Sequence, residues 1–188
     1  MTSTTIDGST QPGNTNPLGP EIEIEGSHLD TEGGRNYTGL KIGQNNTTIK
    51  SLIINGFYRP IYINANNTRV ESCYLGTDYT GTARSAHNAR YETGIYLYAG
   101  VSTSSFSMGT NNIIGGDTPE KGNVIGFAEE NGIYVYSNAS YTFRNNAIIN
   151  NGRSGIYITT QTTYGVINNN VIRGNNGSGI RVLEASMG

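Results

Sequence analysis

The chain has 188 residues, of which 26 are Gly, none is Trp and one is Cys, and only 14% are charged, with a formal net charge of −2. This composition disfavours helices, because Gly and Asn are poor helix formers, and it provides no basic arm for nucleic acid and no polybasic patch for a membrane surface. The single Cys excludes an intramolecular disulfide framework and a zinc site built from cysteines. No apolar run reaches the length of a membrane span, and the first ten residues lack the apolar stretch of a signal peptide.

A four-residue motif that alternates apolar and polar residues recurs along the chain. Its copies are Glu21-Ile22-Glu23-Ile24, Gly39-Leu40-Lys41-Ile42, Pro60-Ile61-Tyr62-Ile63, Gly94-Ile95-Tyr96-Leu97, Gly132-Ile133-Tyr134-Val135, Gly155-Ile156-Tyr157-Ile158 and Gly179-Ile180-Arg181-Val182. The last three copies begin 23 and 24 residues apart. Such alternation is typical of a strand that buries one face.

A second motif lies between these copies and supplies two further strands in each repeat. Residues 143–148 align with residues 166–171, and residues 49–54 align more loosely with residues 70–75. Three short strands in about 23 residues, with no helical stretch, predict one coil of a right-handed parallel β-helix. We therefore expect an all-β, single-stranded solenoid of about seven coils, forming one domain over residues 1–188. Loop insertions near 76–93 and 112–122 should leave the coils.

Stacked coils place equivalent residues in columns, and the repeat predicts which residues share one. Two inward columns are Leu40, Ile61, Ile95, Ile133, Ile156, Ile180 and Ile42, Ile63, Leu97, Val135, Ile158, Val182. A third inward column is Ile54, Leu75, Ile125, Ile148, Val171. Asn123, Asn146 and Asn169 should form an asparagine ladder at one turn, since Asn tolerates left-handed backbone angles. Cys73 and Leu52 occupy that same turn position, so we expect Cys73 to be a buried structural residue.

Three separated segments resemble bacterial right-handed β-helix repeat proteins of the pectin-lyase-like superfamily. They are TTIDGSTQPGNTNPLGPEIEIEGS, LGTDYTGTA and NNIIGGDTPEKGNVIG, in that order. The resemblance implies the fold, but not one activity, because this superfamily includes polysaccharide lyases, hydrolases and epimerases as well as adhesins and phage tailspikes. It also implies an extracellular or cell-surface location, with this chain as one module of a longer protein.

In enzymes of that superfamily the substrate lies along the outer face of the sheet that the Gly-Ile-x-Ile copies form. On this face the resemblance directs attention to stacked tyrosines, because aromatic rings and phenol hydroxyls both contact sugars. The predicted carbohydrate-binding residues are Tyr62, Tyr96, Tyr98, Tyr134, Tyr136, Tyr157, Lys41 and Arg181. Two other interpretations remain open: the tyrosines pack well in a sheet without binding anything, or they form a protein–protein interface.

Catalysis and metal binding have weaker signals. The paired Asp residues and Gly-His-Gly segment of polygalacturonase-type enzymes do not occur in the chain. We expect Glu23, Glu25 and Lys41 on neighbouring strands, where they could bind calcium and supply a base. Alternatively, Glu23 and Lys41 form a cross-strand ion pair. We otherwise expect no cofactor. His28 and His87 fall in loops without metal-ligand spacing, and Asp78, Asp117 and Glu120 fit ordinary turns beside the insertions.

Three hypotheses for function follow from these observations. The first is a module that binds polysaccharide along the tyrosines. The second is a polysaccharide lyase, hydrolase or epimerase with no recognisable catalytic motif. The third is an assembly module that stacks end to end, because the open ends of a solenoid expose unpaired strand edges. Neither nucleic acid nor membrane insertion is expected.

Overall fold

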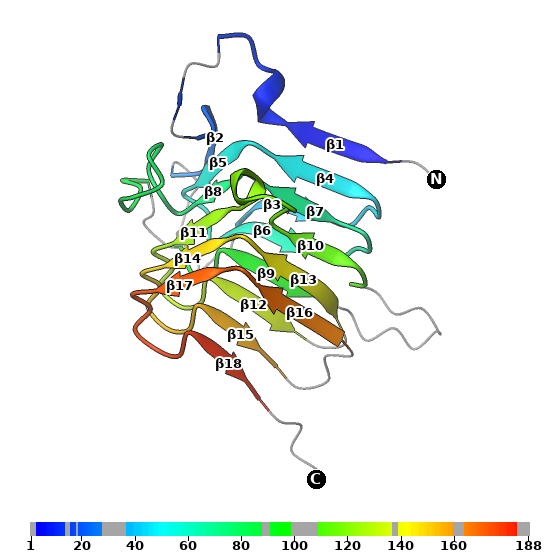
Figure 1. The fold of residues 1–188 in the computed structure, drawn as a ribbon. Helices are drawn as coiled ribbons and strands as arrows, with labels where there is room; N and C mark the ends of the chain where they lie inside the picture. The colour runs from blue at the N-terminus through cyan, green and yellow to red at the C-terminus, as the bar shows by residue number, and fades with distance from the viewer. Residues whose placement is uncertain are drawn as a thin grey trace.

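The structure is a computed structural model that describes residues 3–13, 16–17, 19–27, 37–87, 91–98, 109–136, 139–159 and 164–183. Within these residues, 18 strands form three sheets of six strands each. The chain visits the three sheets in turn, so every coil adds one strand to each sheet, and all sheet pairs are parallel. The coils stack from β1 at one end to β18 at the other (Figure 1).

Each sheet is named after its first strand. The β1 sheet contains β1 (Thr4–Asp7), β4 (Thr47–Lys50), β7 (Arg69–Glu71), β10 (Asn112–Ile114), β13 (Ser140–Arg144) and β16 (Tyr164–Asn168). The β2 sheet contains β2 (Ile22–Glu25), β5 (Leu52–Asn55), β8 (Tyr74–Leu75), β11 (Val124–Gly126), β14 (Ala147–Ile149) and β17 (Val171–Arg173). The β3 sheet contains β3 (Thr38–Ile42), β6 (Arg59–Ile63), β9 (Ile95–Tyr98), β12 (Ile133–Tyr136), β15 (Ile156–Ile158) and β18 (Ile180–Val182). Two short 3-10 helices complete the described elements, η1 (Gly8–Thr10) and η2 (Pro119–Lys121).

The core is a set of apolar columns inside the solenoid. Both columns that the sequence predicted for the β3 sheet are confirmed, from Leu40 to Ile180 and from Ile42 to Val182. In the middle coils these side chains are fully buried, as for Ile61, Ile95 and Ile133. Parallel sheets with a covered inner face favour such β-branched side chains, which pack well on a pleated surface.

The first copy of the repeat motif belongs to a different sheet from the one predicted. Residues 22–25 form β2, which pairs with β5 so that Ile22 lies opposite Leu52 and Glu23 opposite Ile53. The predicted position beside Lys41 is therefore wrong, and each sheet has six strands instead of the seven copies counted. The error has a simple cause, because alternation of apolar and polar residues fits any strand with one buried face.

In the last coil the predicted register is wrong by one residue. Ile148 pairs with Ile172, whereas Val171 pairs with Ala147 and is 55% exposed. The ladder position is likewise occupied by Asn170, and Asn169 takes a left-handed φ of 54° beside it. This coil is one residue longer than the preceding one, so a constant repeat of 23 misses the register by one.

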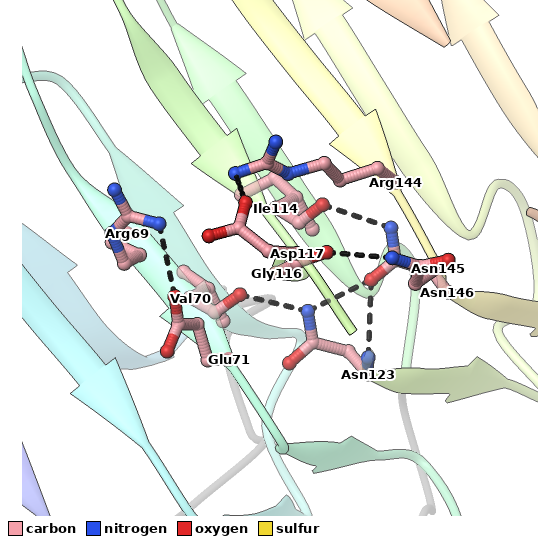
Figure 2. Close-up of polar contacts among 10 residues, drawn as sticks. All are labelled: Arg69, Val70, Glu71, Ile114, Gly116, Asp117, Asn123, Arg144, Asn145 and Asn146. Carbon is pink, nitrogen blue, oxygen red and sulfur yellow. Dashed lines mark hydrogen bonds and ion pairs between the residues drawn. The ribbon is translucent and has the colours of Figure 1, made fainter. Parts of the chain in front are cut away.

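An asparagine ladder joins successive coils at the turn between the β1 and β2 sheets. The side-chain oxygen of Asn146 accepts from the backbone N–H and the amide of Asn123, at 3.1 and 2.9 Å. Its own amide donates to the oxygen of Asn170 and to the carbonyl of Ile114, both at 2.9 Å. Figure 2 shows this amide between Asn123 and Ile114. As predicted, Cys73 is buried in the same column, where its N–H donates to Asn123 Oδ1.

A second ladder, which the sequence did not predict, lies at the turn that follows the β2 sheet. Asn151 accepts from the backbone N–H of Ala128 at 3.0 Å, and its own N–H and amide donate to Asn175 at 3.0 and 2.9 Å. Because these groups are largely buried, each bond satisfies a polar atom that would otherwise cost free energy. The excess of Asn is thus explained by the architecture.

The second insertion starts later than predicted and is fixed to the outer face of the β1 sheet. Its first residues form β10, so the excursion begins at Gly115. Asp117 forms an ion pair with Arg144, and the Asn145 amide donates to the Gly116 carbonyl at 2.7 Å (Figure 2). Residues 76–87 of the first insertion include an antiparallel bridge between Thr77 and Arg84. No helix among the described residues is long and apolar enough to cross a membrane.

Candidate functional site

The outer face of the β3 sheet carries the six predicted tyrosines on four adjacent strands. Strand alternation turns the Ile and Leu side chains inward and the tyrosines outward. In the parallel register Tyr62, Tyr96, Tyr134 and Tyr157 form one column, and Tyr98 and Tyr136 form a second. We call this surface the tyrosine face: Tyr62, Tyr96, Tyr98, Tyr134, Tyr136 and Tyr157.

The rings of the tyrosine face overlap one another. Their centroids are 5.5 Å apart for Tyr62 and Tyr96, 4.8 Å for Tyr96 and Tyr134, and 5.1 Å for Tyr134 and Tyr157. Interplanar angles of 12°, 28° and 37° accompany these distances. Rings this close and this nearly parallel cannot lie side by side in one plane. Each ring covers part of its neighbour, so the surface offers mainly ring edges and hydroxyls instead of open ring faces.

Lys41 and Arg181 lie at the two ends of the first column, as the sequence predicted. The Lys41 ammonium is 6.0 Å from the ring centre of Tyr62, and the Arg181 guanidinium is 5.4 Å from that of Tyr157. A cation at this distance from a ring face is attracted by the negative potential of the π system. The column is therefore bounded by a positive charge at each end.

A third cation, which the sequence does not predict, lies against the tyrosine face. The Arg59 guanidinium is 4.1 Å from the ring centre of Tyr96 and donates through Nε to Glu92 at 3.0 Å. The Tyr58 hydroxyl donates to the same carboxylate at 2.6 Å. Arg59 and Glu92 are 33 residues apart, and the only signal in the sequence is that each closely precedes a copy of the repeat motif.

Burial and crowding raise the pKa of three phenols in the first column. Burial raises the pKa of Tyr96 to about 12, and the neighbouring Tyr134 adds to this effect. Burial also raises the pKa of Tyr62 and of Tyr134 above the ordinary value of 10.0. Protonated hydroxyls both donate and accept hydrogen bonds, so the face presents a row of groups suited to a polyhydroxyl ligand.

A polar hollow of about 270 Å³ opens beside Tyr134 and Tyr157. Its other lining residues come from the turns before β12 and β15 and from β18: Glu130, Asn131, Arg153, Ser154 and Arg181. Arg153 lies 3.3 Å from Glu130 and has a side chain that is 68% exposed. The hollow thus offers a solvent-accessible guanidinium next to two of the tyrosines.

The predicted acidic group does not form. Glu23 and Glu25 lie on β2, whereas Lys41 lies on β3 of a different sheet, so the proposed cross-strand ion pair is wrong. Glu23 accepts from the Asn55 amide at 2.8 Å, and Glu25 lies 3.8 Å from His87. Within the described part of the chain, no three His, Cys, Asp or Glu side chains are grouped so as to hold a metal ion.

The remaining candidates lie apart from the tyrosine face. Asp78 accepts from Thr80, Thr82 and Ala83; these bonds lower its pKa although partial burial opposes them. It therefore serves as an ordinary turn residue, as expected. Asp117 is paired with Arg144, and Glu120 belongs to η2. His28 lies outside the described residues.

Comparison with known proteins supports the architecture. The family model described as a right-handed β-helix region matches residues 15–187. No curated protein and no solved structure matches the chain significantly.

Proposed function

Because the chain belongs to the right-handed β-helix family, we propose that it is an extracellular or cell-surface module that binds polysaccharide along its tyrosine face. The observation that carries this proposal is the convergence of six tyrosines on four adjacent strands. Their spacing repeats along the solenoid axis, as the residues of a polysaccharide repeat along its chain. Sugar hydroxyls would exchange hydrogen bonds with the phenols, and apolar sugar faces would contact the ring edges.

The charges around the face favour an anionic polysaccharide. Four cations, Lys41, Arg59, Arg153 and Arg181, border or enter the face and its hollow. Two carboxylates, Glu92 and Glu130, are paired with two of them. The whole chain carries a net charge of −2, so this surface is positive relative to the rest. Guanidinium groups bind carboxylate and sulfate well, which agrees with the acidic polysaccharides of the superfamily that the sequence resembles.

A glycan-array screen of the purified chain, followed by variants of the face, tests the proposal. We expect the double variant Tyr96→Ala and Tyr134→Ala to lose retention of the glycans found, while its circular dichroism spectrum remains that of a β protein. Tyr164→Ala is the matched control, since Tyr164 is 70% exposed but lies on the β1 sheet. Should the double variant unfold, Tyr98→Ala with Tyr136→Ala probes the second column.

Two results would reject this assignment: unchanged retention by folded variants of both columns, or equal loss in the Tyr164 control. The same screen addresses the alternative of polysaccharide cleavage. A lyase forms an unsaturated product that absorbs in the ultraviolet, and a hydrolase forms new reducing ends.

A second candidate, end-to-end assembly, is favoured by one observation at the end of the solenoid. No described strand pairs with the outer edge of β16, β17 or β18, and Ile180 and Val182 are 44% and 64% exposed. If the register continued into a second copy, Ile180 would meet Leu40 and Val182 would meet Ile42. Such an edge both exposes apolar surface and offers free backbone hydrogen-bonding groups.

A further inference from the structure

The outer face of the β2 sheet carries an apolar row that two non-repeating segments partly cover. In register, the row runs through Ile53, Tyr74, Val124, Ala147 and Val171. One covering segment is the strap, defined as residues 16–17 and 19–21, and the other is η2. Between the strap and η2 lies a hollow of about 400 Å³ whose floor includes Tyr74, Val124 and Ala147. Its size falls within the range of small-molecule sites.

The strap wall of the hollow is fixed by packing and hydrogen bonds. Gly19 lies so close to Tyr74 that a Cβ atom there would be 2.4 Å from the ring. The side-chain amide of Asn16 donates to the carbonyls of Pro20 and Tyr79, at 3.0 and 3.2 Å. The strap is thereby held both to the sheet and to the first insertion.

The opposite wall is fixed to the preceding coil. The Ser72 hydroxyl donates to the carbonyl of Glu120 at 2.8 Å, and the Ser72 N–H donates to the carbonyl of Lys121 at 3.2 Å. Within the turn, the N–H of Gly122 donates to the carbonyl of Pro119 at 3.0 Å. With both walls anchored, the hollow is formed before any ligand arrives, which reduces the entropic cost of binding.

The lining combines apolar surface with one negative charge and with the polar side chains of Ser51, Ser72, Asn123 and Asn145. The apolar part comes from Pro17, Pro20 and Pro119, from the ring of Tyr74 and from the side chains of Val124 and Ala147. A hydrogen bond from Thr118 lowers the pKa of Glu120, so this carboxylate is ionised at neutral pH. Among the described residues that line the hollow, none is Lys, Arg or His. An anion therefore finds no cationic partner among these residues, unlike on the tyrosine face.

We propose that this hollow is a second binding site, distinct from the tyrosine face, for a small organic cation with an ammonium group on an apolar body. The apolar body would contact the prolines and Val124, and the ammonium group would lie near Glu120. Tyr74 contributes an aromatic ring to the same site, and aromatic rings attract cations. The polysaccharide proposal is independent of this one, since the two sites lie on different sheets.

Benzylammonium, benzyl alcohol and benzoate share a ring and differ in charge, so they are suitable probes. In a nuclear magnetic resonance titration, we expect benzylammonium to shift the amide resonances of Val124 and Ala147 at millimolar concentration. Benzyl alcohol should bind more weakly than benzylammonium, and benzoate should bind most weakly. Glu120→Gln should weaken the binding of benzylammonium by about two- to five-fold, as for an exposed ion pair, and leave the affinity for benzyl alcohol unchanged. This variant changes one exposed side chain and should leave the fold intact.

Filling the hollow provides a second, independent arm. Ala147→Phe should abolish the shifts caused by all three probes, whereas Val171→Phe, one strand further along the same row and outside the hollow, should leave them unchanged. The proposal is overturned if benzoate binds as tightly as benzylammonium, if the shifts lie on the β3 sheet instead, or if benzylammonium causes none. Equal weakening by both Phe variants would also overturn it.

Discussion

The guanidinium of Arg59 lies against the ring of Tyr96, 4.1 Å from its centre, and is held there by Glu92 at 3.0 Å. The chain therefore uses one of its own cations to cover part of a ring that the sequence predicted to face a ligand. Because Arg59 and Glu92 have side chains that are only 25% and 19% exposed, this pair is shielded from solvent and orders the centre of the tyrosine face.

Removing the charge of Glu92 should destabilise the fold. Glu92→Gln leaves the partly buried Arg59 without its anionic partner and weakens the bond to the Tyr58 hydroxyl. We expect a loss of about 1 to 3 kcal/mol in the free energy of unfolding, measured by urea denaturation. Glu130→Gln is the control, since the Arg153–Glu130 pair is exposed and should contribute less than about 1 kcal/mol. Equal losses in the two variants would contradict the special role of the Glu92 pair.

Stability should fall at alkaline pH because of Tyr58 and Tyr96. Burial raises the pKa of each to about 12 in the folded chain, against about 10 when unfolded. Between these values the native state retains protons that the unfolded state loses, so the stabilisation present below pH 10 or so disappears as pH rises toward 12. Urea midpoints over this range should fall less steeply in Tyr96→Phe than in the parent. Identical slopes would refute the prediction.

The asparagine ladder should be sensitive to the loss of a single amide. Asn146→Ala leaves the N–H of Asn123 and the carbonyl of Ile114 without their partner in a buried turn. The expected cost is about 3 kcal/mol in the free energy of unfolding. Asn176→Ala provides a matched change at an exposed position and should cost less than about 0.5 kcal/mol. Thermal or urea denaturation that ranks the two variants alike would disprove the structural role of the ladder.

Two glycines should respond oppositely to a methyl group. Gly115 has a φ of +90°, and a Cβ atom there would lie 1.8 Å from the Arg144 carbonyl oxygen. Gly115→Ala should therefore destabilise the chain by about 2 to 3 kcal/mol. Gly43 has open space around its Cβ position, so Gly43→Ala should be neutral or stabilise by up to about 1 kcal/mol. Calorimetric melting of both variants measures the difference, and a stable Gly115→Ala protein would contradict the close contact.

If the C-terminal edge mediates assembly, a charge on it should suppress association. Val182 is 64% exposed and belongs to β18, so Val182→Lys would place an ammonium group where a second copy would stack. We expect light scattering of the parent to grow with concentration and that of the variant to remain constant. Thr5→Lys is the control: Thr5 lies on the outer face of β1 at the opposite end, so this variant should associate like the parent. A parent chain that stays monomeric throughout the series would rule this function out.

The fold was predictable from the sequence because its main signal is local. Alternation in each Gly-Ile-x-Ile copy determines which side chains point inward, and the repeat length brings equivalent copies together. The same reasoning failed for Ile22–Glu25, whose pattern fits every sheet equally well. It failed again at Val171, where one extra residue in the coil shifted the register.

The candidate site was predictable in part. The columns of tyrosines follow from strand alternation, so their positions could be read from the repeat. The overlap of the rings could not be predicted, because the spacing of residues along the chain does not determine side-chain rotation. Arg59 and Glu92 come from different coils and lie outside the alternating motif, and only the folded chain brings them together. The hollow on the β2 sheet similarly depends on the strap and η2, neither of which repeats.

In the last two coils the two asparagine ladders also divide the coil into a constant part and a variable part. Asn146 and Asn170 are each followed five residues later by a member of the second ladder, Asn151 and Asn175. In these coils the arc through the β2 sheet thus has one length, and side-chain amides bonded to a neighbouring coil fix both of its ends. The additional residue of the last coil falls in the remaining arc, between Asn151 and Asn170. The fold should accordingly tolerate grafted peptides or engineered loops on that arc, but not between the two ladder residues of a coil, such as Asn146 and Asn151.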